Sequence, residues 1–214
     1  MERWRGRAIY AAVWLACAWP MAGLAYGMAS DIFLQTSILG ANPIEKLTRS
    51  LGDWGLRFLL IGLTITPAAR LLRQPRLIRF RRTVGLWAFA YICLHLSSYV
   101  VLDHFFDWPT IGKDIVKRPY ITIGMTAFVL LIPLAVTSLD SLHRRLGPKR
   151  WKALHRAVYV VAVLGVIHFL LLVKADRTQP TIYGAILAVL LGYRVWTWAR
   201  APRRRKPAQA AVKA

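Results

Sequence analysis

Residues 83–102 read TVGLWAFAYICLHLSSYVVL, twenty consecutive positions without Asp, Glu, Lys or Arg. A helix of about 20 residues, rising ~1.5 Å per residue, crosses the ~30 Å hydrocarbon core of a bilayer. Two other uncharged runs, at residues 8–30 and 119–139, are 23 and 21 residues long. These three runs indicate a protein that spans a membrane several times.

Three shorter uncharged runs become long enough to span a bilayer if an arginine at one end snorkels toward the surface. We therefore predict an all-α integral membrane protein, a bundle of six transmembrane helices with both termini in the cytoplasm. The interiors of the spans contain no Asp or Glu. The predicted spans are residues 8–29, 54–72, 83–103, 119–139, 153–173 and 179–199.

The first span could instead be a cleaved signal peptide. Basic Arg3, Arg5 and Arg7 precede it, and small residues at 23–25 would suit cleavage. Its uncharged run is longer than the usual apolar region of about 7–15 residues in such peptides. We therefore expect this segment to remain as the first helix.

The charge distribution predicts the orientation. The chain of 214 residues is 57% hydrophobic, which excludes disorder, and carries 30 Lys and Arg against 9 Asp and Glu, a net charge of +21. With the N-terminus inside, 20 of the 30 basic residues fall in inner segments and 7 in outer loops. This asymmetry favours cytoplasmic termini over a nucleic-acid-binding role.

The same pattern divides the chain into a basic cytoplasmic N-terminus (1–7), a transmembrane domain (8–199) and a basic cytoplasmic tail (200–214). We interpret the run RRRK at 203–206 as an anchor on anionic lipid, because no base-reading motif accompanies it. No stretch of the sequence repeats another.

Two cysteines, Cys17 and Cys93, both fall inside predicted spans. Neither belongs to a C-x-x-C pair, which excludes a c-type haem attachment and disfavours a thiolate zinc site. We expect both to be buried as small apolar side chains.

Two histidines lie deep inside separate spans. His95 is ~20 Å along a helix from Arg82, and His168 is ~24 Å along a helix from Lys152, so both lie on the outer side of the midplane at similar height. Ionisable residues at such depth suggest a function. The spacing leaves two interpretations open, axial ligation of a haem iron or hydrogen bonding between helices.

The remaining three histidines have other surroundings. His155 is predicted near the inner surface, where the third span offers Arg81 or Arg82 rather than a second histidine. His104 and His143 lie in polar stretches outside the spans, and we expect both to be solvated.

Several motifs between about residues 8 and 198, each weak alone, together resemble the ferric-reductase-like transmembrane superfamily. They are NPIE (42–45), GDW (52–54), LTITP (63–67), RRTVGLW (81–87), LHL (94–96), DIVKRPYIT (114–122), PLAVTS (133–138), RRLG (144–147), Trp151, LHRAVY (154–159) and HF (168–169).

The resemblance implies a b-type haem, with His95, His155 and His168 as the three intramembrane histidines of the family. It also implies an FMN and a place in the bacterial inner membrane. The chain would carry electrons from the quinone pool to a periplasmic molybdenum-containing reductase that repairs methionine sulfoxide in envelope proteins. It would be the electron-transfer subunit rather than the reductase itself.

This chain departs from relatives that hold two stacked haems. Those carry a second histidine 13 or 14 residues from the first on the third span, where this chain has Arg82 and Arg81. We therefore predict one well-defined haem held by His95 and His168. His155 would be a ligand with a non-histidine partner or a contact of a propionate or flavin. The two arginines would bind haem propionates or a flavin phosphate, or simply anchor the inner surface.

Two other functions compete with electron transfer. A transporter or channel predicts acidic residues or glycine-broken helices at the midplane, and the span interiors contain no Asp or Glu, which counts against proton- or cation-coupled transport. A structural membrane anchor leaves the paired histidines unexplained. The sequence also lacks a nicotinamide-binding glycine fingerprint, so a fused NADPH-dependent reductase is excluded for this chain.

Overall fold

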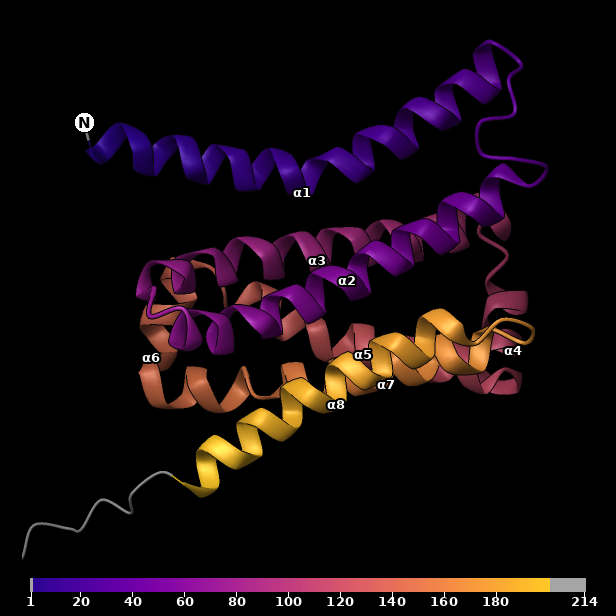
Figure 1. Cartoon of the computed structure of the whole chain (residues 1–214). Helices are drawn as coiled ribbons and strands as arrows, with labels where there is room; N and C mark the ends of the chain where they lie inside the picture. Colours follow the sequence, from indigo (N-terminus) through magenta and orange to yellow (C-terminus); the bar gives the residue numbers. More distant parts are fainter. Residues whose placement is uncertain (1, 201–214) are drawn as a thin grey trace, which may run out of the picture.

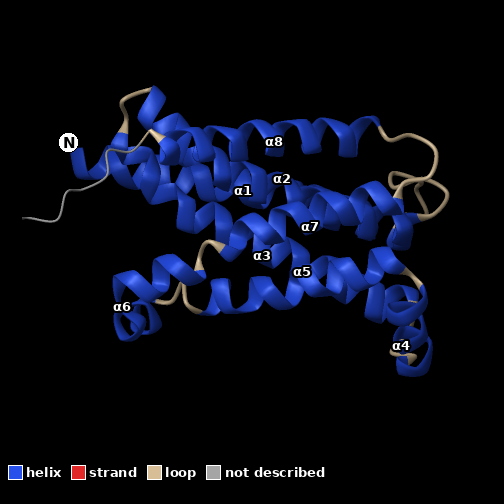
Figure 2. Ribbon diagram, turned by 90° about the horizontal axis from the view of Figure 1, so that it is seen from below, coloured by secondary structure: helices blue, strands red, loops and turns tan. Residues whose placement is uncertain are grey.

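The computed structural model describes residues 2–200, and every element in this range is a helix (Figures 1 and 2). No strand occurs among these residues, which confirms the all-α prediction. Met1 and residues 201–214, with the predicted lipid anchor at 203–206, lie outside the described residues. The elements are α1 (Glu2–Phe33), α2 (Pro43–Leu71), η1 (Pro75–Arg79), α3 (Phe80–Ser98), η2 (Tyr99–Asp103), α4 (Trp108–Lys117), α5 (Pro119–Val136), α6 (Asp140–Leu154), α7 (Ala157–Leu172) and α8 (Thr178–Ala199).

Four of these helical units are long and apolar enough to cross a membrane. They are α1 from Arg7 onward, the η1–α3–η2 unit over Pro75–Asp103, α5 and α8. The α6–α7 pair, bent by 47°, adds a fifth if it counts as one broken span. The chain is therefore a membrane protein with several apolar helices, and these units coincide with five of the six predicted spans.

The sixth predicted span corresponds to α2, which is longer and more polar than expected. It begins at Pro43 rather than near residue 54, because Asn42 caps it by accepting a hydrogen bond from the Glu45 amide at 3.2 Å. The helix therefore includes Asp53, which lies ten residues inside it and directly before the predicted span 54–72. Asp53 is paired with Arg57 one turn later, at 2.6 Å.

Two antiparallel helix pairs build the centre of the molecule. α2 packs along α3, and α5 packs along α7, more extensively than any other helices, and α8 lies against α2 and α7 (Figure 1). Buried apolar side chains fill the interface between the pairs. They include Leu51, Phe58 and Leu59 of α2, Val84, Ala88 and Tyr91 of α3, Ala127 and Leu131 of α5, and Val161 of α7.

α1 is fastened to this core beside its internal proline. The Tyr91 hydroxyl of α3 donates to the Cys17 carbonyl at 2.9 Å and accepts from the Met21 amide at 2.8 Å. An unbroken helix would join these two backbone groups directly, but Pro20 lies between them. The Tyr91 hydroxyl thus satisfies two backbone groups beside Pro20. Cys17 is buried, as predicted, whereas Cys93 is only partly buried.

Two helices outside the long apolar runs were not predicted. α4 lies in the loop that was predicted to be outside, and Asp107 caps it by accepting from the Thr110 amide at 3.2 Å. α6 occupies the loop that was predicted to be inside and is interrupted at Gly147, whose φ of +71° suits a residue without a Cβ. Both are short and rich in polar residues, so hydropathy alone does not mark them.

Candidate functional site

The structure brings His95 of α3 and His168 of α7 together between the two helix pairs. Their ring centroids lie 6.3 Å apart, with the ring planes at 77°. Both side chains are partly buried. The expectation that two histidines at similar height would face each other across the bundle is thus met in its geometry.

Each of these imidazoles is held through its Nδ1 atom by the backbone of a neighbouring helix. His95 Nδ1 lies 2.8 Å from the Thr48 carbonyl oxygen of α2, and His168 Nδ1 lies 2.6 Å from the Tyr120 carbonyl oxygen of α5. A carbonyl only accepts hydrogen bonds, so Nδ1 carries the proton in both rings. Nε2 then remains as an unprotonated nitrogen, the arrangement that metal-binding histidines commonly show.

The pair suits a shared metal centre. The two ring centroids lie 6.3 Å apart, so one metal ion between the rings could be held by both imidazoles. A haem needs only two protein ligands, because its macrocycle occupies the other four positions. No group of three or more His, Cys, Asp or Glu side chains that could hold a metal ion alone occurs within residues 2–200. The donor set therefore suits a haem better than a bare metal ion.

His155 is not part of this pair. It caps the end of α6, where its Nε2 lies 3.1 Å from the Thr137 hydroxyl and its ring stacks on Trp151 with centroids 4.0 Å apart. The Trp151 indole in turn donates to the Thr137 carbonyl at 3.0 Å. The described contacts of His155 thus hold the elbow between α6 and α7.

The two arginines of the predicted cofactor site, Arg81 and Arg82, lie at the N-terminal end of α3. Arg82 forms a 2.6 Å ion pair with the exposed Asp140 at the start of α6. Arg81 is the adjacent residue and is partly exposed. Both lie 13 or 14 residues before His95, which is about 20 Å along a helix, so they form a separate inner-side group.

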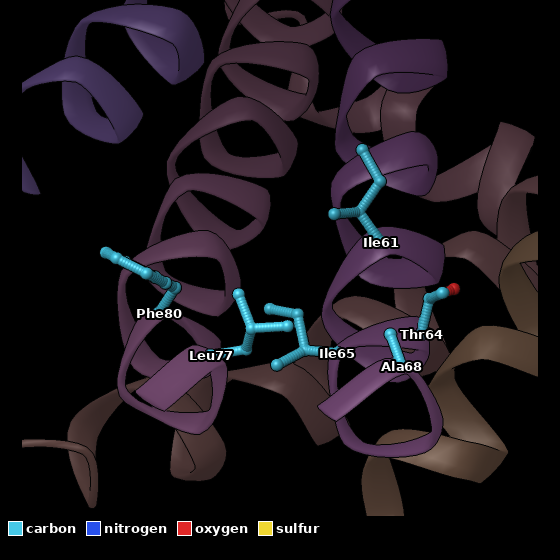
Figure 3. A pocket seen from close by; sticks show the side chains of 6 residues that line it. All are labelled: Ile61, Thr64, Ile65, Ala68, Leu77 and Phe80. Carbon is cyan, nitrogen blue, oxygen red and sulfur yellow. The ribbon is translucent and has the colours of Figure 1, made fainter. Parts of the chain in front are cut away.

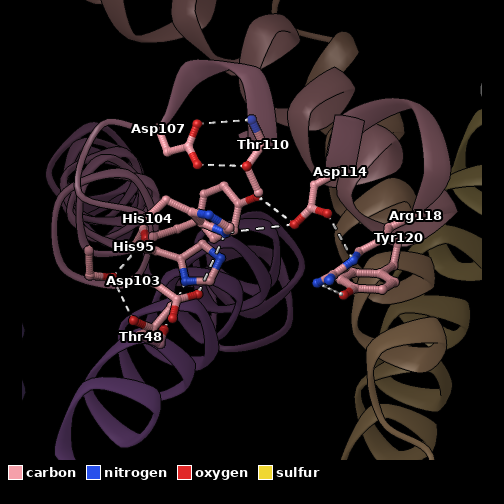
Figure 4. A network of polar contacts seen from close by, with 11 residues as sticks. Thr48, His95, Asp103, His104, Asp107, Thr110, Asp114, Arg118 and Tyr120 are labelled. Carbon is pink, nitrogen blue, oxygen red and sulfur yellow. Dashed lines mark hydrogen bonds and ion pairs between the residues drawn. The ribbon is translucent and has the colours of Figure 1, made fainter. Parts of the chain in front are cut away.

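A polar network centred on Asp114 joins η2, α4 and the start of α5 (Figure 4). At its centre Asp114 is only 8% exposed, accepts from the Tyr99 hydroxyl at 3.2 Å, and pairs with Arg118 Nε at 3.1 Å. Arg118 also donates to the Tyr120 hydroxyl at 3.3 Å. Tyr120 is the residue whose carbonyl holds His168, so this network extends to one of the two imidazoles.

The same network corrects the expectation for His104. Its side chain is only 16% exposed rather than solvated, with Nε2 3.6 Å from Asp114 and its ring 4.5 Å from that of Tyr99. His143 is exposed, as predicted, and lies edge-on to Trp151. The strongly polar sequence around His104 concealed its burial, because the neighbours that cover it come from α4 and η2.

Asp107, another acidic residue of this region, is exposed to solvent. Asp107 accepts from both the hydroxyl and the amide of Thr110, at 2.6 and 3.2 Å. These hydrogen bonds lower the pKa of the Asp107 carboxyl, because they favour its charged form. Asp107 therefore stays ionised as the cap of α4.

A second unpredicted group joins α2 to α8. The Arg57 guanidinium pairs with Asp53 at 2.6 Å and donates to the Tyr183 hydroxyl at 2.6 Å, while that hydroxyl donates to Asp53 at 2.8 Å. All three side chains are thus mutually satisfied. The i,i+4 spacing of Asp53 and Arg57 in the sequence indicates that these two residues can pair on a helix. It does not indicate Tyr183, which lies 126 residues after Arg57.

An apolar crevice lies between the inner half of α2 and the η1–α3 unit (Figure 3). The one polar side chain in it is Thr64, whose hydroxyl donates to the Leu60 carbonyl. This crevice contains none of the predicted site residues. Its lining residues are Ile61, Thr64, Ile65, Ala68, Leu77 and Phe80.

Comparison with known proteins gives a consistent result. Residues 51–166 match the family described as "Ferric reductase like transmembrane component". A protein of Caulobacter vibrioides named "Protein-methionine-sulfoxide reductase heme-binding subunit MsrQ" is 56% identical, over 93% of this chain and 92% of the relative. Proteins of the same name from Rhodospirillum rubrum and Herminiimonas arsenicoxydans are 58% and 54% identical, over 80% and 78% of this chain and 81% and 78% of the relatives.

Proposed function

The chain belongs to the MsrQ heme-binding subunits of the ferric-reductase-like transmembrane family, and from this premise we propose that it is a b-type cytochrome. The observation that carries the proposal is the facing pair His95 and His168, each with Nδ1 bonded to a backbone carbonyl. In this proposal their Nε2 atoms would hold the iron of the haem, which would supply one-electron transfer when bound.

We propose that the electrons come from the quinone pool and leave to a periplasmic MsrP-type molybdenum reductase that repairs methionine sulfoxide in envelope proteins. The relatives are named as subunits of a protein-methionine-sulfoxide reductase, which supports the reaction class. The position of the pair supports the direction. His168 is bonded to Tyr120, the second residue of α5, so the ligands lie near the end of the bundle that holds α4.

The proposed topology has six spans in the bacterial inner membrane, with both termini in the cytoplasm. α2 is the sixth span, because its buried face joins α3 and its only interior acidic residue past the first turn, Asp53, is neutralised by Arg57. The proposed division is a basic N-terminus at 1–7, a transmembrane domain at 8–199 and a basic tail at 200–214. The excess of basic residues in the segments assigned inside supports this orientation.

FMN is proposed as the second cofactor, at the inner end of the bundle. Arg81 and Arg82 are the candidate contacts for its phosphate, since guanidinium groups bind such anions with two hydrogen bonds. His155 is proposed as a further contact there, of the flavin or of a haem propionate. It lies at the α6–α7 elbow, on the same inner side as Arg82 and Asp140.

Spectroscopy on the purified protein in detergent tests this function. We expect a Soret band that shifts on adding dithionite and also on adding a quinol. With the purified molybdenum reductase present, quinol should then support reduction of methionine sulfoxide only when this chain is included. A folded, colourless protein would contradict the proposal and would favour a haem-independent transporter or a structural membrane anchor.

A further inference from the structure

The two histidines of the site are seated in the same way on two different helices. His95 bonds the carbonyl of Thr48, and Gly52 follows Thr48 by one turn of α2. In the same way, His168 bonds the carbonyl of Tyr120, and Gly124 follows Tyr120 by one turn of α5. The hydrogen-bonded residues are 47 and 48 positions apart in the two cases. The α2–α3 and α5–α7 pairs therefore repeat one local geometry, although their sequences show no repeat.

In both cases the glycine faces the imidazole at a distance that a side chain would not permit. A Cβ on Gly52 would lie 3.0 Å from His95 Nδ1 and 3.1 Å from its Cε1. A Cβ on Gly124 would lie 2.8 Å from His168 Nδ1 and 3.0 Å from its Cε1. Carbon atoms make their best contacts at about 3.5–4.0 Å, so either substitution would push the ring away from its carbonyl.

We propose that Gly52 and Gly124 are positioning residues for the two imidazoles. Each lets its ring approach the neighbouring helix closely enough to donate Nδ1–H to the carbonyl one turn earlier. That bond fixes the tautomer, leaves Nε2 for the metal, and holds the two ring planes at 77°. This inference rests on the proposed haem ligation, and it adds that positions 52 and 124 must be glycine for the two rings to reach their carbonyl partners.

The chain offers matched controls on the same kind of helix. A Cβ on Gly85 of α3 or on Gly192 of α8 would meet nothing within 4 Å. Alanine also has a higher helix propensity than glycine. Gly85→Ala and Gly192→Ala should therefore fold at least as well as the parent chain and bind haem equally well.

The test compares Gly52→Ala and Gly124→Ala with these controls, using haemin titration of the apoprotein and electron paramagnetic resonance of the oxidised protein. We expect haem affinity to fall about 10–100-fold in Gly124→Ala, the usual range for losing a partner that orients a metal ligand. The fall in Gly52→Ala should be smaller, because its contact is longer. The g values of the low-spin signal depend on the angle between the axial rings, so they should change in both.

The outcomes separate this inference from the proposed function. If the parent chain binds haem and both alanine variants match Gly85→Ala and Gly192→Ala in affinity and g values, the positioning role is refuted while the ligation stands. If the parent chain binds no haem, the proposed function itself fails. Gly52→Ala decides the matter if Gly124→Ala does not give monodisperse protein, since its ring needs to move only a few tenths of an ångström.

Discussion

Each imidazole at the centre of the bundle is fixed through one nitrogen, and this decides what its other nitrogen can do. The Nδ1 bonds of His95 and His168 to backbone carbonyls are short, at 2.8 and 2.6 Å. A backbone carbonyl moves less than a side chain, so it orients a ligand without adding a titratable group. The two rings are thus oriented by the backbones of the neighbouring helices.

The surroundings of His155 lead to a different expectation for that residue. His155→Ala removes its hydrogen bond to Thr137 and its stacking on Trp151, but touches neither His95 nor His168. We expect this variant to keep most of its haem and to lose thermal stability at the α6–α7 elbow. Haem per polypeptide and the midpoint of thermal unfolding in detergent measure the two effects.

His143→Ala is the matched control, because His143 also lies against Trp151 but is exposed. If His155→Ala lost as much haem as substitution of His95 or His168, a second haem or a shared ligand would follow, and the single-haem account would be wrong.

At the scale of elements, the Tyr91 phenol is one of the contacts that attach α1 to α3. Tyr91 is fully buried and bridges the Cys17 carbonyl and the Met21 amide, the groups on either side of Pro20. α1 also contacts α3 through Trp14, whose ring lies 4.8 Å from that of Trp87, and through Tyr10, whose hydroxyl accepts from Thr83 at 3.1 Å. Several of its large apolar side chains are exposed. Backbone groups without a hydrogen-bond partner are costly inside a bilayer, so we expect the Tyr91 hydroxyl to contribute to stability by pairing with two of them.

Tyr91→Phe should therefore destabilise the protein. It leaves a buried donor and a buried acceptor without their partner, each worth about 1–3 kcal/mol. We expect a lower thermal midpoint in detergent and faster proteolysis within α1. Tyr26→Phe, also on α1 but exposed, should leave both unchanged. Equal stability of Tyr91→Phe and the parent chain would show that α1 is held by other contacts.

The boundaries of α2 show what hydropathy misses. The uncharged run in this helix covers only residues 58–69, because Arg57 and Arg70 bound it, and Asp53 lies further toward the start of the helix. In the fold these two charges satisfy each other and Tyr183 of α8. The i,i+4 spacing was visible in the sequence, but the partner on α8 depends on tertiary packing, so the true start at Pro43 could not be read from apolar content.

For the whole molecule, the long apolar runs predicted most of the architecture. Five predicted spans coincide with apolar helices or the bent pair, and the facing of His95 and His168 followed from their depths. The glycines that seat the rings were not predicted, because a glycine in an apolar helix has no chemical signature of its own. In the sequence, Thr48 and His95 are 47 residues apart, and Tyr120 and His168 are 48 residues apart. This similarity can be recognised only after both hydrogen bonds are known.

The polar groups of the bundle are concentrated at its two ends. The histidine pair lies toward the end that holds α4, with the Asp114 network beside it. Arg82 and His155 lie at the other end, around α6. If both cofactors bind as proposed, the haem lies near the periplasm and the flavin near the cytoplasm, so electrons would move outward along the bundle.

The measurement that tests the central claim most directly is haem per polypeptide, by the pyridine haemochrome method, in the parent chain and in His95→Ala and His168→Ala. We expect about one haem per chain in the parent, as one pair of axial imidazoles requires. Each variant should lose most of it while remaining monodisperse in detergent. Haem contents equal to the parent in both variants would contradict the assignment of His95 and His168 as the ligand pair.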